Sequence, residues 1–163
     1  MAISAPTQST QYVDYVAGNK VAGYDWGAKV RHNFFSLTFT AAGFTSADAL
    51  DIFLVKLPAG LIRVLTPLSW IYCPIGTATA DLDIGWAAYV DNTGATIAAD
   101  GDGFADSLDV GGAAIDQTLP LPSVGRIKEF NSRNGVVIAC SFDTANSPGA
   151  GVMNGWIAYQ LVG

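Results

Sequence analysis

The residues best suited to chemistry in this chain are a single histidine and a run of closely spaced carboxylates. His32 is the only histidine, which rules out a site built from several imidazoles and leaves one candidate general base. It stands between Arg31 and Asn33 at the start of an expected strand, where a hydrogen-bonded surface imidazole is the simpler interpretation. We therefore assign His32 no catalytic role.

The clearest constellation is the segment 100–106, with the sequence Asp-Gly-Asp-Gly-Phe-Ala-Asp. Asp100, Asp102 and Asp106, on a loop loosened by glycine, offer the oxygen ligands that a hard cation such as Ca²⁺ takes. The match with an EF-hand loop is partial, because Phe104 stands where an oxygen ligand is needed and Gly111 stands where the bidentate Glu belongs. A metal site at the three aspartates is one hypothesis. The alternative is a solvated turn, in which the Asp side chains bond to the backbone and Gly adopts the turn conformation.

A second pair of carboxylates also allows two interpretations. Asp81 and Asp83 share one face of an expected strand and lie about 7 Å apart at a rise of ~3.3 Å per residue, a spacing that glycosidases use. A polar outward face opposite Leu82 and Ile84 explains them equally well. Elsewhere the chain carries no nucleophile-elbow, zinc-protease, Walker or dinucleotide signature. We expect no enzymatic activity and no cofactor.

Aromatic side chains are the remaining candidates for binding. Trp86 and Phe142 fall on apolar strand faces and are expected in the core. Trp156 shares its face with Asn154 and Gln160, so we expect it to be either a buried sandwich residue or an anchor in an interface. The other interface candidates precede residue 30 and are Tyr12, Tyr15, Tyr24 and Trp26.

Alternation of apolar and polar residues predicts the strands that position these side chains. Phe35, Leu37 and Phe39 share one face of the first strand. In the segment 81–90 the predicted inner face carries Leu82, Ile84, Trp86, Ala88 and Val90. The expected strands are 33–40, 50–57, 61–66, 68–73, 81–90, 125–130, 136–142 and 153–161, and residues 91–94 form a hairpin turn. The segment 98–117, rich in glycine and aspartate, is expected to be a long loop that contains at most one helical turn.

Composition points to one β-rich domain. The chain has 163 residues, 50% of them hydrophobic and only 13% charged, which is far from the disordered class. Glu129 is the single glutamate among 14 acidic residues, a bias toward turn and strand formers rather than helix formers. We predict an all-β fold, an antiparallel β-sandwich of jelly-roll-like form, with a mobile N-terminal arm at 1–15 and a single domain at 16–163.

Charge, hydropathy and cysteine usage limit the partners and the location. A net charge of −6 without a basic run makes nucleic acid an improbable partner, since phosphate binding needs a concentrated basic footprint. We expect no membrane span, because no apolar stretch approaches ~20 residues, and no secretion signal, hence synthesis in the cytoplasm. Cys73 and Cys140 lie in apolar runs and are expected as buried free thiols.

Three segments carry a resemblance to a known family: 103–110, 130–138 and 153–159. They are similar to the small β-sandwich proteins that accompany the major capsid protein in tailed bacteriophages. The resemblance implies a capsid decoration, or cement, protein without an active site. Such a protein is made in the host cytoplasm, binds the outer capsid lattice of the virion, bridges neighbouring capsomers and strengthens the shell.

The resemblance also implies partners. They are the major capsid protein and further copies of the chain, with a homotrimer as the expected assembly and the arm as a contact element. An alternative from another class is a receptor- or carbohydrate-binding module of the tail or fibre, since jelly rolls also bind sugars. An enzyme is the third possibility, and a pocket that gathers His32 with two carboxylates would favour it.

Overall fold

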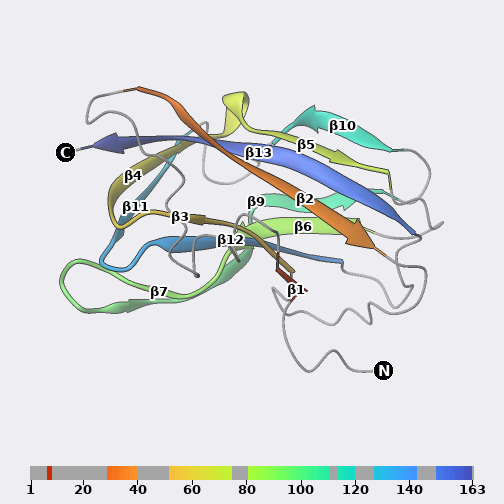
Figure 1. Ribbon diagram of the computed structural model, residues 1–163. Helices are drawn as coiled ribbons and strands as arrows, with labels where there is room; N and C mark the ends of the chain where they lie inside the picture. Colours follow the sequence, from red (N-terminus) through yellow and green to blue (C-terminus); the bar gives the residue numbers. More distant parts are fainter. Residues whose placement is uncertain are drawn as a thin grey trace.

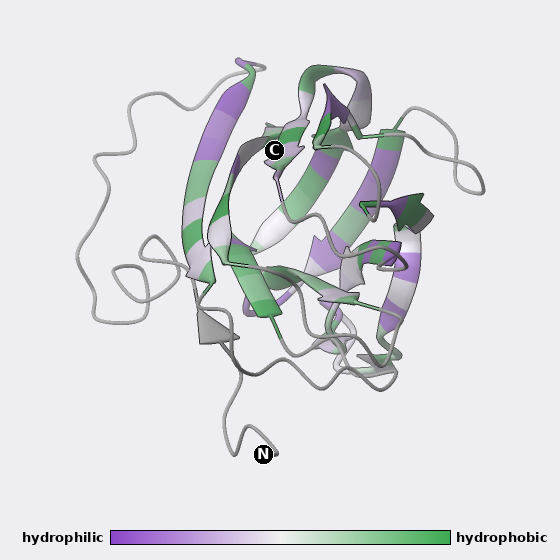
Figure 2. Ribbon diagram, turned by 90° about the vertical axis from the view of Figure 1, so that its right-hand side faces the viewer, coloured by the Kyte–Doolittle hydropathy of each residue, from purple (hydrophilic) through white to green (hydrophobic). Residues whose placement is uncertain are grey.

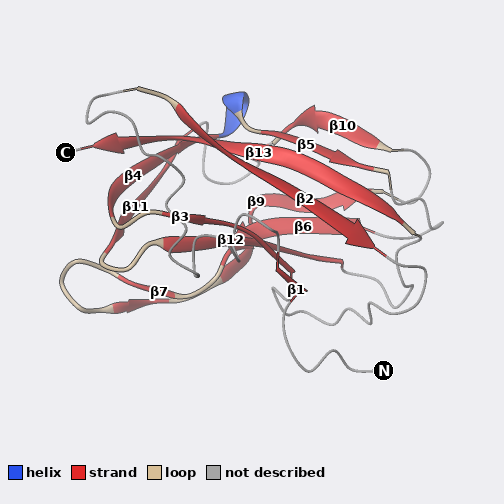
Figure 3. Cartoon of the chain, in the orientation of Figure 1, coloured by secondary structure: helices blue, strands red, loops and turns tan. Residues whose placement is uncertain are grey.

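The computed structural model describes residues 7–8, 29–39, 52–74, 81–110, 114–119, 127–142 and 150–162. Its regular structure consists of strands with a single 3₁₀ turn, η1 (Thr66–Leu68), as Figure 3 shows. Within these ranges no helix is long and apolar enough to cross a membrane. The strands are β1 (Thr7–Gln8), β2 (Arg31–Phe39), β3 (Ile52–Leu57), β4 (Gly60–Leu65), β5 (Trp70–Cys73), β6 (Asp81–Trp86), β7 (Tyr89–Val90), β8 (Thr96–Ile97), β9 (Asp100–Asp109), β10 (Ile115–Thr118), β11 (Ile127–Ser132), β12 (Val136–Phe142) and β13 (Gly151–Val162).

The strands build two facing sheets, which form the lower and upper layers in Figure 1. The first sheet has the order β1-β3-β12-β6-β9, and the second has β10-β5-β13-β4-β11 with β2 paired to β13. Both β4 and β5 pair with β13, at successive positions along it, so they are two halves of one strand interrupted by η1. In the same way β11 pairs with β4 and β10 pairs with β5. The second sheet is therefore four strands wide.

The pairing follows a folded ribbon. Antiparallel partners are β2 with β13, β3 with β12, β4 and β5 with β11 and β10, and β6 with β9. If β4–β5 and β10–β11 are each counted as one interrupted strand, the first four strands of this set along the chain pair with the last four in reverse order. This is the connectivity of a jelly roll, and it confirms the predicted antiparallel sandwich.

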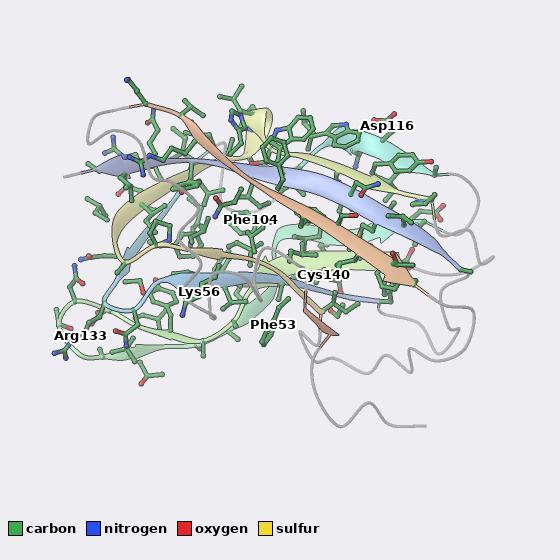
Figure 4. All side chains as sticks on the ribbon, viewed as in Figure 1. Phe53, Lys56, Phe104, Asp116, Arg133 and Cys140 are labelled. Atoms are coloured by element: carbon green, nitrogen blue, oxygen red, sulfur yellow. The ribbon has the colours of Figure 1, made fainter. Side chains whose placement is uncertain are left out.

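Side-chain alternation produces the shared core. Phe35, Leu37 and Phe39 are buried as predicted, and so are Leu82 and Ile84. Figure 2 shows hydrophilic and hydrophobic residues alternating along the strands. Figure 4 places Phe104 and Cys140 between the two sheets. Burial of these apolar surfaces is the main force that holds the layers together.

The predicted inner face of 81–90 ends earlier than expected. Trp86 is buried, but Ala88 is exposed and Val90 is only half-buried. The chain leaves the first sheet after Trp86 and forms the separate β7–β8 hairpin. Its predicted turn at 91–94 is confirmed, with Gly94 at a φ of +92° that favours glycine.

Both cysteines are free and buried, as the sequence predicts. Cys73 lies on β5 and Cys140 on β12, in opposite sheets. Burial raises the pKa of the Cys140 thiol well above its usual value, and the neighbouring Cys73 and Asp83 raise it further. The Cys140 thiol is therefore a neutral core group rather than a nucleophile.

The predicted loop at 98–117 is wrong, because most of it is strand. β9 is the edge of the first sheet within the described residues, and it buries Phe104 and Ala105 completely. Asp102, Asp106 and Asp109 are exposed along it. Exposed charges on an edge strand discourage pairing with other chains, which explains why a strand here is rich in aspartate.

The glycine content of β9 also has a structural cause. Two register shifts interrupt its pairing with β6, as expected where an edge strand carries bulges. A Cβ on Gly103 would come within 2.2 Å of the Trp86 ring, so only glycine fits. The helical turn allowed for in this segment is also absent from the described residues: Ser107 on β9 has a φ of 52°, and its N–H donates to Asp83 Oδ1 at 2.7 Å.

Candidate interface on the second sheet

The outward side of the second sheet carries a row of aromatic rings. Residues paired across antiparallel strands face the same side, and Trp156 on β13 is paired with Phe34 on β2 and with Trp70 on β5. Phe34 is 56% exposed and both indoles are half-buried. We call these three side chains the aromatic ridge, and the side of the sheet that carries them the outer face.

The two indoles of the ridge stack on each other across neighbouring strands. Trp70 and Trp156 have ring centroids 4.8 Å apart and planes inclined by 25°, an overlapping, offset arrangement. The separation equals the usual spacing of neighbouring strands, so the rings lie face to face across the strands. The Phe34 ring lies at one end, with its centroid 6.0 Å from that of Trp156 and its plane inclined by 54°, and Tyr72 lies nearly parallel to Trp70 at 6.2 Å.

Hydrogen bonds hold both indoles in place. Trp70 Nε1 donates to Asp116 Oδ1 and Trp156 Nε1 donates to the Leu68 carbonyl oxygen, each at 2.8 Å. Asp116 lies on β10 and is labelled at the upper right of Figure 4. Leu68 lies on η1, which rises above the upper sheet in Figure 1. Because both ring N–H groups are satisfied within the chain, the orientation of the ridge is set before any partner binds.

Other exposed apolar side chains surround the ridge. Among the described residues six large hydrophobic side chains are exposed, and five of them belong to the outer face or its margins. The exception is Ile97 on β8. Exposed apolar side chains that gather on one face of a sheet are typical of a protein interface. The five are Val30, Phe34, Leu68, Ile127 and Val152.

The outer face carries little net charge. In the described part of this sheet, Arg63 and Glu129 point outward and form an ion pair with each other across β4 and β11. Asp116 is bonded to Trp70. The first sheet, by contrast, carries several carboxylates. Asp81 and Asp109 are directly paired there, and the edge strand β9 exposes its aspartates. The two sides of the sandwich thus differ in polarity.

The structure brings one predicted interface residue into this site. Trp156 was expected either in the core or as an anchor in an interface. It is half-buried on the outward side of the sheet, so it is not a core residue, and its role as an anchor stays a prediction. Tyr12, Tyr15, Tyr24 and Trp26 lie outside the described residues. His32 is exposed at the end of the ridge, with its ring centroid 6.4 Å from that of Trp156.

Sequence reasoning missed several members of the site. They come from η1 and from two strands, β2 and β5, so no single segment shows them together. One signal was available, since Phe34 shares the polar face of its strand with Ser36 and Thr38. The missed residues are Phe34, Leu68, Trp70 and Tyr72.

The three aspartates of the metal hypothesis do not form a metal site. Asp100 and Asp106 lie six positions apart on β9, and register shifts against β6 fall between them. Asp106 accepts a hydrogen bond from Ser107 Oγ at 2.8 Å. Burial and a hydrogen bond with Asp102 raise the pKa of Asp100. Within the described ranges no group of three or more His, Cys, Asp or Glu side chains is placed to hold a metal ion.

Asp81 and Asp83 take part in the sheet itself. Asp83 accepts from the Ser107 backbone and pairs with Ser141 on β12, while Asp81 pairs with Asp109. These positions agree with the interpretation as the polar, outward side of a strand. These contacts add no support to the interpretation of Asp81 and Asp83 as a glycosidase pair.

Comparison with known proteins adds a likeness of fold. No family model and no curated protein sequence matches the chain. Among solved structures, the chain is similar to one in "Cyanophage Pam1 capsid asymmetric unit", with a TM-score of 0.50 and 16% sequence identity. The match covers 88% of this chain and 92% of that one. At this identity the similarity shows a shared fold over nearly the whole length of both chains.

Proposed function

We propose that this chain is a non-enzymatic structural protein of a phage virion, which binds the outer capsid lattice and stabilises the shell. The observation that carries the proposal is the nearly full-length likeness of fold to a chain of a cyanophage capsid asymmetric unit. The segments that resemble decoration proteins support it, since they fall on β9, on β11 and β12, and on β13. The exposed, nearly uncharged outer face supplies a surface for such binding.

The proposed partners are the major capsid protein and further copies of the chain. We propose a homotrimer, because decoration proteins commonly occupy three-fold positions of a shell. Light scattering should then give about three times the chain mass of 17.0 kDa. A single species of chain mass, both free and on capsids, would contradict the trimer.

The arm at 1–15 is proposed as a second contact element. Only Thr7–Gln8 of it is described, as β1 in parallel pairing with Ile52 and Phe53 of β3. A chain that lacks residues 2–15 should bind capsids more weakly than the full chain. Unchanged binding would remove the arm from the interface.

Cosedimentation with capsids of the same phage that lack this protein tests the main proposal. We expect saturable binding and a gain in particle survival after a heat or osmotic challenge. Binding without any gain in survival would contradict the stabilising role. Absence of binding would contradict the proposal as a whole.

The exposed rings favour one alternative, a receptor- or carbohydrate-binding module of the virion. Stacked aromatic side chains are a common means of holding sugars. Under this alternative the protein binds host cell-surface saccharides and not empty capsids, which a parallel sedimentation with host cells distinguishes.

A further inference from the structure

We infer that the aromatic ridge inserts into an apolar groove on the coat-protein surface and is the main shell-binding element of this chain. The inference rests on the proposed function and goes further, because it assigns the contact to one face and states the chemistry of the partner surface. Its residues are Phe34, Trp156 and Trp70, flanked by Leu68 and Tyr72.

The outer face has the size of a stable protein interface. β13 has 12 residues and crosses the whole sheet, which gives a length of about 40 Å at ~3.3 Å per residue. Four strand positions span about 19 Å at ~4.8 Å per strand. The resulting area, about 760 Å², is close to the roughly 800 Å² that each partner buries in a standard interface.

The stacked indoles favour a protein groove over a saccharide. Because Trp70 and Trp156 overlap at 4.8 Å, the ring faces between them are already in contact with each other. A sugar stacks on an open ring face, and here one face of each indole is already occupied. Large aromatic side chains pack well against aliphatic side chains and other rings. A groove lined with such groups is the complementary surface.

The geometry also disfavours a second copy of the chain. In a two-fold contact centred on the ridge, the same surface meets itself, so that the ridge would press against the ridge of the other copy. In a head-to-tail contact the ridge would need an apolar surface elsewhere on the chain. Ile97 is the one exposed large hydrophobic residue that the described part offers away from the outer face. Within the described residues the chain thus offers no complementary surface for the ridge, which favours a groove on another protein.

The charge distribution predicts how this contact responds to salt. The outer face has an internally paired Arg63 and Glu129 and a carboxylate, Asp116, that is bonded to Trp70. Electrostatic attraction across the interface is small under these conditions, and apolar burial dominates. Capsid affinity should change little between low and physiological salt concentration.

Two substitutions to glutamate test the inference. Phe34→Glu places a charge on the ridge, and Ile97→Glu places the same charge on an exposed hydrophobic residue outside the outer face; Phe34 and Ile97 are 56% and 36% exposed. We expect Phe34→Glu to weaken capsid binding by roughly tenfold or more, the range of an interface hot spot. Ile97→Glu should bind within about twofold of the unsubstituted chain, since isolated surface changes have small effects. Leu68→Glu repeats the test on another element, and circular dichroism confirms that each variant is folded.

The outcomes separate the inference from the proposed function. If the unsubstituted chain binds capsids and Phe34→Glu and Leu68→Glu bind equally well, the inference is overturned while the proposed function stands. If the unsubstituted chain does not bind capsids, the proposed function itself fails. A Phe34→Glu variant that loses self-association but keeps capsid binding would assign the ridge to a contact between copies. Loss of saccharide binding alone would assign it to a glycan, and either result overturns the inference.

Discussion

Single carboxylates organise the backbone of this protein. Asp91 Oδ1 accepts hydrogen bonds from the Thr93 and Ala95 N–H groups and from the Thr93 hydroxyl. These bonds hold the pKa of Asp91 below its usual value, and the bond from the Thr93 hydroxyl has the largest effect. The Asp-Asn-Thr-Gly turn is thus built by local side-chain bonding, which is why it is recognisable from sequence.

Asp100 has the opposite environment. Burial raises its pKa, and the hydrogen bond with Asp102 and its charge raise it further, while Lys128 acts in the other direction. A carboxyl whose folded pKa is raised favours the folded state when protonated, and this contribution is lost as pH rises through the folded pKa. Ionised Asp100 therefore disfavours folding at neutral pH.

Replacing Asp100 by asparagine tests this environment. We expect Asp100→Asn to be slightly more stable than the unsubstituted chain at pH 7, by less than about 1 kcal/mol because solvent screens most of the interaction. The difference should shrink toward acidic pH, where Asp100 is protonated. Urea unfolding across this pH range measures it. A gain that stays the same toward acidic pH would contradict the assignment.

At the scale of elements, the interrupted strand β4–η1–β5 shapes the outer face. Ser69 follows η1 and is fully buried. Its Oγ donates to the Leu65 carbonyl oxygen at 3.0 Å and accepts from the Ala158 N–H at 2.9 Å. This single hydroxyl thus fills the gap in the β13 pairing between β4 and β5. It also holds η1 where the Leu68 carbonyl oxygen meets Trp156.

Removal of that hydroxyl should destabilise the fold. Ser69→Ala leaves the buried Ala158 N–H without its acceptor, and an unsatisfied buried donor costs about 1–3 kcal/mol. The free energy of unfolding, measured in urea, should fall by this amount. Ser36→Ala, an exposed serine of the same sheet, should change it by less than about 0.5 kcal/mol. Equal losses in the two variants would argue against the role of Ser69.

At the scale of the whole molecule, both sheets share one hydrophobic core. A single cluster of buried residues includes Leu37 and Ile62 of the second sheet and Leu54 and Ile84 of the first. The rings of Trp86, Phe104 and Phe130 meet in edge-on or tilted contacts across the two sheets, with centroids 5.2 to 6.1 Å apart. Neither sheet can therefore bury its inner face without the other.

A shared core predicts cooperative unfolding. Tryptophan fluorescence and far-ultraviolet circular dichroism should report the same urea midpoint, as expected for a single domain that unfolds in one step. Fluorescence reports on side-chain packing at Trp70, Trp86 and Trp156, and circular dichroism reports on the strands. Two separated midpoints would show that the sheets unfold independently.

The amino-acid pattern alone determined the fold class and most strands. Period-two alternation identified the buried faces of Phe35, Leu37 and Phe39 and of Leu82 and Ile84, because burial on one side of a sheet imposes that period on neighbouring residues. The hairpin turn at 91–94 was equally local. The bulged strand β9 was mistaken for a loop because the causes of its composition lie elsewhere in the fold. Gly103 is required by the close approach of Trp86, and the aspartates suit a strand at the edge of its sheet.

Only the tertiary structure decided where the candidate interface lies. Phe34, Trp70 and Trp156 belong to strands far apart in the sequence, and their contact depends on the register of β13 with β2 and β5. The arrangement of Asp100, Asp102 and Asp106 likewise follows from the bulged pairing of β9 with β6. Alternation states which side of a strand a residue faces, but not which other strand lies beside it. That choice is made by long-range pairing and by the packing of the whole core.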